Sequence, residues 1–107
     1  MSFDALEVSL ELIRSLLQTV TVLRTRDPKL HDQIRRAASG VPLNLAEGRR
    51  RAGKDRVYHF TVAAGSADEF RTALRTANAW GELDAAHFTQ ALALLDRVQA
   101  MLWRLTH

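Results

Sequence analysis

The sequence predicts an all-α protein, an antiparallel four-helix bundle. Only two prolines and five glycines interrupt the 107 residues, and no run of four or more residues alternates as a strand rich in β-branched and aromatic side chains would. Apolar residues instead recur at helical spacing in four long segments with short connections, which makes consecutive helices antiparallel neighbours. A chain of this length holds one core, so residues 1–107 are expected to form a single domain.

The first predicted helix runs from near Asp4 to near Arg26. Asp4 and Glu7 have the spacing of a capping box, and Phe3 and Val8 have that of a hydrophobic staple. The row expected to face the core has spacings of four and three residues: Leu6, Leu10, Ile13, Leu17 and Val20. A second apolar row lies beside it: Leu12, Leu16 and Leu23. The two rows together are wider than one neighbouring helix requires, which indicates additional burial.

The second predicted helix starts at Asp27 and Pro28, an N-cap followed by a proline in the first helical position. It extends to Gly48, which has the position of a C-terminal cap. Pro42 lacks an amide hydrogen and is expected to kink this helix near Gly40, or else to split it there.

The third predicted helix begins within residues 53–55 and stops at Gly81. The fourth opens at Asp84, another N-cap, with Leu83 and Phe88 as a staple pair. A turn centred near residue 51 would pair the second and third helices as Gly40 with Gly65, Ser39 with Ser66, Arg36 with Glu69, Glu47 with Arg56 and Asn44 with His59. Small residues at the first two pairs would let the backbones approach closely.

Arg36 and Glu69 support two interpretations. They are either a partly buried ion pair that fixes the register of the two helices, or two solvated side chains whose attraction contributes less than about 1 kcal/mol.

The excess positive charge is confined to one segment. The net charge is +3, and residues 28–56 alone carry eight basic and three acidic groups, a balance of +5. Five of the basic groups form a cluster: Arg49, Arg50, Arg51, Lys54 and Arg56. Such a focused field favours a polyanion, and because no aromatic residue lies within the cluster, contacts to a nucleic-acid backbone are favoured over base stacking. The alternative is a solvated loop between helices.

Several chemistries lack the residues they need. There is no cysteine, which excludes thiolate chemistry and favours a reducing cytoplasm. The four histidines have no partner at metal-ligand spacing, and Asp84 three residues before His87 is better explained as a helix cap. Neither a membrane span nor a secretion signal is recognisable. We therefore expect no metal, no cofactor and no enzymatic activity.

The width of the apolar rows predicts self-association. On the fourth helix, the stripe Leu92, Leu95, Leu102 and Leu105 is extended by Leu94, Val98, Met101 and Trp103. With the second row of the first helix, this surface exceeds what three bundle neighbours cover, so Leu16 and Trp103 are expected at an interface between copies. The alternative is a thick single bundle that buries both rows.

Four sequence elements carry a family resemblance: FDALEV at residues 3–8, Q-I-x-R-A-A at 33–38, N-x-A-E-G at 44–48 and G-S-A-x-E at 65–69. They resemble the four-helix bundle proteins encoded by intervening sequences of bacterial 23S rRNA genes, a family related to the accessory variability proteins of diversity-generating retroelements. The resemblance implies a non-catalytic homopentameric barrel. For the retroelement relatives it implies binding of nucleic acid and of a reverse transcriptase.

Two functions therefore compete. The leading hypothesis is a homo-oligomer that binds RNA, DNA or a ribonucleoprotein through the basic cluster. The alternative is a protein scaffold or adaptor without nucleic-acid contact. Salt distinguishes them, because counterion release makes phosphate binding fall steeply with ionic strength.

Overall fold

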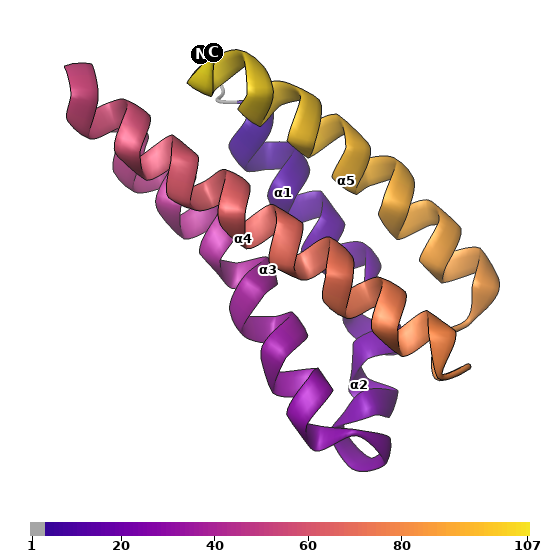
Figure 1. The fold of residues 1–107 in the computed structure, drawn as a ribbon. Coiled ribbons are helices and arrows are strands. Elements are labelled where there is room, and N and C mark those ends of the chain that lie inside the picture. Colours follow the sequence, from indigo (N-terminus) through magenta and orange to yellow (C-terminus); the bar gives the residue numbers. More distant parts are fainter. Residues whose placement is uncertain (1–3) are drawn as a thin grey trace.

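The computed structural model describes residues 4–107 and is all-α, with five helices and no strand in that range. The helices are α1 (Asp4–Ser15), α2 (Leu17–Arg26), α3 (Pro28–Arg49), α4 (Gly53–Ala79) and α5 (Ala85–Thr106) (Figure 1). Their contacts form a closed circuit: α3 packs on α4, α4 on α5, α5 on α1 and α1 on α3, while α2 packs mainly on α3. The predicted staple at Phe3 lies outside the described residues.

The first predicted helix is in fact two helices, so the expectation of one continuous helix is wrong. The Leu16 amide donates to the carbonyl of Ile13 (3.1 Å), three residues back instead of four, and the Val20 amide resumes the helix by donating to Leu16 (2.8 Å). The Ser15 hydroxyl donates to the Leu12 carbonyl (2.7 Å), and such local bonds compete with the regular helical pattern. The break lets α1 pack against α5 while α2 follows α3.

The two apolar rows of this segment have the opposite roles from those expected. Leu12, Leu16 and Leu23, the row expected to lie outside the bundle, are buried in the core. In the other row Leu17 is 69% exposed, and its remaining members are only half-buried. The buried face includes Ser9, whose hydroxyl donates to a carbonyl of its own helix. A core face predicted only from the positions of large apolar side chains is therefore wrong here. The observed core face is completed by small and polar residues.

Helix α3 begins as predicted and continues further than predicted. The Asp27 side chain accepts a hydrogen bond from the Leu30 amide (3.2 Å), which confirms the cap. The helix passes Pro42 without a break, so the alternative of a split helix is wrong, and the kink stays a prediction. The Asn44 side chain donates to the Gly40 carbonyl (2.8 Å), so it bonds within its own helix.

Two glycines bring α3 and α4 together. A Cβ on Gly40 would lie 2.6 Å from the Ser66 hydroxyl oxygen, and one on Gly48 would lie 2.7 Å from ring carbons of Phe60. The predicted close approach is therefore present, but its partner is Ser66, since a Cβ on Gly65 would meet nothing within 4 Å. The residue that faces Gly40 therefore differs by one position from the prediction. Gly48 lies inside the helix and is a packing position instead of a C-cap.

The connection between α4 and α5 contains the predicted helix-ending glycine and the predicted N-cap. Gly81 has φ +74°, a left-handed conformation that side chains disfavour, and it follows the last turn of α4. Asp84 Oδ1 then accepts from the amides of Ala86 (2.9 Å) and His87 (3.1 Å), which confirms this cap.

On α5 the apolar excess is smaller than expected. Leu94 and Val98, expected to extend beyond the bundle, are buried within the chain. For these residues the alternative of a thick bundle that buries both rows is confirmed. Trp103 is 62% exposed, and its ring stacks on that of His107 with centroids 3.4 Å apart.

A polar network that sequence reasoning missed joins α4 to α5. Arg71 Nε donates to Gln99 Oε1 (2.9 Å), and a second nitrogen of Arg71 pairs with the Asp96 carboxylate. Gln99 Nε2 donates in turn to Asp68 Oδ1 (2.8 Å). These residues lie 25 to 31 positions apart, so only the interhelical register brings them together.

Candidate nucleic-acid interface

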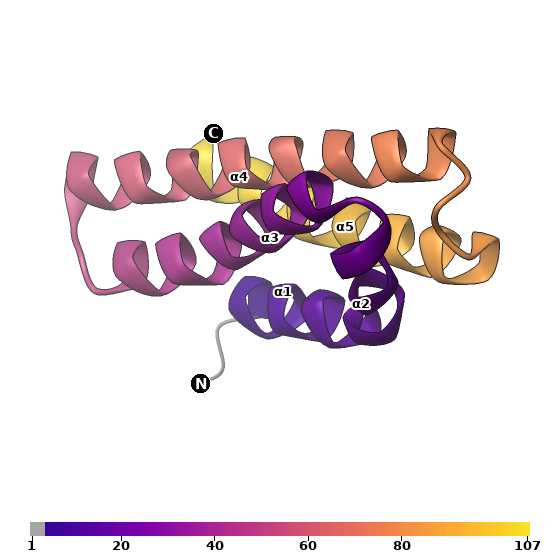
Figure 2. The ribbon, with the colours of Figure 1, turned by 90° about the horizontal axis from the view of Figure 1, so that it is seen from below.

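The basic cluster lies where α3 ends and α4 begins. We call Arg49, Arg50, Arg51, Lys54 and Arg56 the basic turn; all five are exposed. Figures 1 and 2 show this hairpin tip extending past the neighbouring ends of α1 and α5. The structure thus brings the predicted residues together on a protruding end of the molecule.

The guanidinium of Arg51 forms ion pairs with two carboxylates of the same hairpin. It approaches Glu47 Oε1 at 2.6 Å and Asp55 Oδ2 at 3.0 Å. The hydrogen bond from Arg51 lowers the pKa of Glu47 below its ordinary value, and the same bond raises the pKa of Arg51. Glu47 therefore forms its ion pair with Arg51, while Arg56, predicted to lie near Glu47, bonds to the carbonyls of the next two residues, Gly48 and Arg49.

Arg56 closes the C-terminus of α3. Its Nε donates to the Gly48 carbonyl (3.3 Å) and its Nη2 to the Arg49 carbonyl (3.2 Å). The Gly48 carbonyl also accepts from the Arg51 amide (3.0 Å), and the negative end of the helix dipole favours a cation at this position. Arg51 and Arg56 thus hold the turn in shape, which leaves less of their charge for an external ligand.

Arg50 and Lys54 differ from these two. Both are exposed, and among residues 4–107 neither side chain takes part in an ion pair. They flank the N-terminus of α4, where the N-cap residue Ala52 provides no side-chain hydrogen bond. The positive end of a helix dipole favours an anion at such a position, and Asp55 already places one carboxylate in this first turn.

His59 lies behind the basic turn and was expected to face Asn44. Its Nδ1 is buried without a hydrogen bond, and its Nε2 is 3.9 Å from the carboxylate of Asp55. The Cβ of His59 packs 3.2 Å from the position that a Cβ on Gly48 would take, so the ring belongs to the interface between α3 and α4.

The other predicted site residues lie away from any shared site. Arg36 and Glu69 are both exposed, and neither belongs to an ion pair found in the described chain, so the partly buried pair is wrong. Leu16 is only 3% exposed within one chain, which makes it a core residue instead of an interface residue. Trp103 remains available on the surface of α5.

Residues 4–107 hold no group of three or more histidine, aspartate or glutamate side chains placed to bind a metal ion. Over the same residues, no helix has both the length and the hydropathy required to cross a membrane.

These features define a class: a small helical protein with one core and a protruding basic turn between two long helices. The chain belongs to the 23S rRNA-intervening sequence protein family, whose model matches residues 2–104. This match confirms the resemblance of the four sequence elements, while the relation to retroelement proteins stays a prediction.

One solved structure has the same fold. It is described as a protein with unknown function from the S23 ribosomal protein family of Bacteroides thetaiotaomicron VPI-5482. The two chains superpose with a TM-score of 0.84 at 15% identity, over 95% of this chain and 97% of the other. No curated protein matches the sequence.

Proposed function

We propose that this protein is a non-enzymatic, homo-oligomeric protein of the cytoplasm that binds the phosphate backbone of RNA or DNA through the basic turn. The observation that carries the proposal is the pair Arg50 and Lys54. Both are exposed cations without an ion-pair partner in the described chain, and they lie beside an uncapped helix N-terminus at the tip of the molecule. Phosphates interact favourably with both features.

The charge balance supports this choice of ligand. The five cations of the basic turn face two nearby carboxylates, Glu47 and Asp55, which leaves a local balance of +3. Both carboxylates form ion pairs with Arg51, and within residues 4–107 neither forms one with Arg50 or Lys54. The family name refers to the rRNA gene that carries the coding sequence, and it adds no evidence for a ligand.

Self-association would multiply a weak site. Repetition of the basic turn around a ring raises the effective affinity for a long polyanion. Leu16 gives no physical support for assembly because it is buried, and the support comes from other exposed apolar side chains: Leu43, Trp80 and Trp103, each at least 62% exposed. A ring of five is the assembly that the family resemblance implies.

A protein adaptor is the second candidate. The exposed rings of Trp80 and Trp103 favour it, because tryptophan side chains frequently anchor protein interfaces. A reverse transcriptase is the partner that the resemblance implies. Such docking would involve the surface of α5 at Trp103 or the end of α4 at Trp80.

A matched pair of double variants tests the proposal. Arg50→Ser/Lys54→Ser removes two charges from the basic turn, and Arg75→Ser/Arg97→Ser removes two exposed charges elsewhere on α4 and α5. Fluorescence anisotropy with a labelled RNA hairpin and a DNA duplex at low salt measures the affinity. We expect the turn variant to bind all sequences more weakly by about tenfold or more, and the control to lose much less. Absence of binding by the parent protein would favour the adaptor. An equal loss of affinity in both variants would mean that binding depends on the total net charge and not on the position of these two cations.

A further inference from the structure

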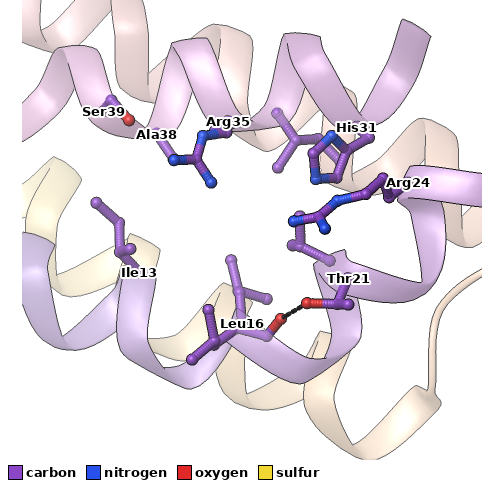
Figure 3. A pocket seen from close by; sticks show the side chains of 11 residues that line it. Ile13, Leu16, Thr21, Arg24, His31, Arg35, Ala38 and Ser39 are labelled. Atoms are coloured by element: carbon purple, nitrogen blue, oxygen red, sulfur yellow. Dashed lines mark hydrogen bonds between the residues drawn. The ribbon is translucent and has the colours of Figure 1, made fainter. Parts of the chain in front are cut away.

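A second surface, distinct from the basic turn, lies at the break between α1 and α2. A groove opens there between these two helices and α3 (Figure 3). Its floor is aliphatic and consists of Ile13, Leu16, Leu17 and Val20. Leu16 closes the bottom as part of the core, whereas Leu17 is 69% exposed.

The row on α2 has the spacing of a helix face. Leu17, Val20 and Arg24 are three and four residues apart on α2, and Ile13 lies before the break, on α1. At 1.5 Å per residue the row on α2 is about 10 Å long, or about two helical turns. A partner helix with apolar residues at matching spacing can lay them along such a row.

The rim of the groove is positively charged and unneutralised. Arg24 on α2 and Arg35 on α3 are both exposed, and their guanidinium groups point toward the groove, from the right and from above in the view of Figure 3. Neither forms an ion pair within residues 4–107, and no acidic side chain lines the groove. Asp32, next in sequence to the groove residue His31, lies 3.2 Å from the Nδ1 of that histidine through its carboxylate. Two unpaired cations across an apolar floor are complementary to carboxylates on an amphipathic segment.

We propose that this groove docks an acidic amphipathic helix of a protein partner. The apolar face of that helix covers Leu17 and its neighbours, and its carboxylates pair with Arg24 and Arg35. A nucleic-acid backbone fits the groove poorly, because it has no apolar surface to cover the aliphatic floor and the groove offers no tryptophan, tyrosine or phenylalanine ring for base stacking. The site is separate from the nucleic-acid interface and does not depend on it.

The probe is a fluorescein-labelled helical peptide of about four turns, with leucines at i, i+4 and i+7 flanked by glutamates. Its twin carries lysines in place of the glutamates. The full-length protein is compared with a rim variant, Arg24→Gln/Arg35→Gln, and with Arg75→Gln/Arg97→Gln, which removes the same charge elsewhere. Circular dichroism confirms that each variant folds.

We expect saturable binding of the glutamate peptide, a loss of about tenfold in the rim variant, and little change in the control. The lysine peptide is expected to bind at least tenfold more weakly. Three results would overturn the proposal. The glutamate peptide could fail to show saturable binding up to a protein concentration of about 1 mM, both peptides could bind equally, or both variants could lose affinity equally. Self-association of the parent protein that Leu17→Lys abolishes would also overturn it, since a second copy would then cover the groove. The rim variant and its control are expected to bind nucleic acid equally, so failure here is distinguishable from failure of the basic turn.

Discussion

The ring of Phe60 occupies the space that a side chain on Gly48 would need. A Cβ at Gly48 would lie 2.7 Å from two ring carbons, and both residues are buried where α3 and α4 meet. This contact lies immediately behind the tip of the hairpin. It therefore sets the separation of the two helices whose ends present Arg50 and Lys54.

Gly48→Ala is expected to destabilise the protein. Overpacking costs about 1–3 kcal/mol because an aromatic ring in a packed core has little room to move, and this exceeds the helix-propensity gain of about 1 kcal/mol. Urea denaturation followed by circular dichroism measures the change in the free energy of unfolding.

The matched control is Gly65→Ala, since a Cβ there would meet nothing within 4 Å. This change is expected to raise the free energy of unfolding by about 0.5–1 kcal/mol. If the two alanine variants are equally stabilised, the close approach at Gly48 is not present in solution.

Leu16 and Leu17 are adjacent, and they are expected to respond very differently to truncation. Leu16→Ala removes a core side chain and is expected to cost about 2–5 kcal/mol of stability, whereas Leu17→Ala is expected to cost less than about 0.5 kcal/mol. Thermal and urea denaturation of the two variants measures both. A larger cost at Leu17 would restore the originally predicted core face and contradict the break after Ser15.

The Glu47–Arg51 pair predicts a dependence of tip geometry on pH. Because the folded pKa of Glu47 is lowered, the interaction is fully present above the ordinary pKa of 4.5 and is lost as the pH falls through the lower folded value. An NMR titration of the Glu47 side chain is expected to give a pKa below 4.5 in the parent protein and a higher one in Arg51→Gln. Identical values in the two proteins would show that the pair does not form.

The helix caps were predictable because each depends on a few consecutive residues. Asp27 and Asp84 need only a following amide in the right place, and both accept hydrogen bonds as expected. The ion pairs of Arg51 were also accessible from sequence, since Glu47 and Asp55 each lie four residues away, a spacing at which helical side chains meet.

The remaining differences depend on tertiary structure. The break at Leu16 was hidden because the apolar pattern continues through it, and the core face depends on which neighbours α1 and α2 contact. The facing of Gly40 and Ser66 depends on where the turn places the start of α4, which local patterns define only to within a residue or two. The network of Arg71, Gln99 and Asp68 depends on that same long-range register.

The salt dependence of nucleic-acid binding tests the central claim most directly. Titrations of a labelled DNA duplex at several salt concentrations give the slope of log K against log [salt], which reports the number of phosphates that are neutralised. For Arg50→Ser/Lys54→Ser we predict a slope smaller in magnitude by about two contacts, or about 1.8, while Arg75→Ser/Arg97→Ser keeps the parent slope. A parent protein that binds with the same slope as the turn variant would contradict the assignment of Arg50 and Lys54 as the phosphate contacts.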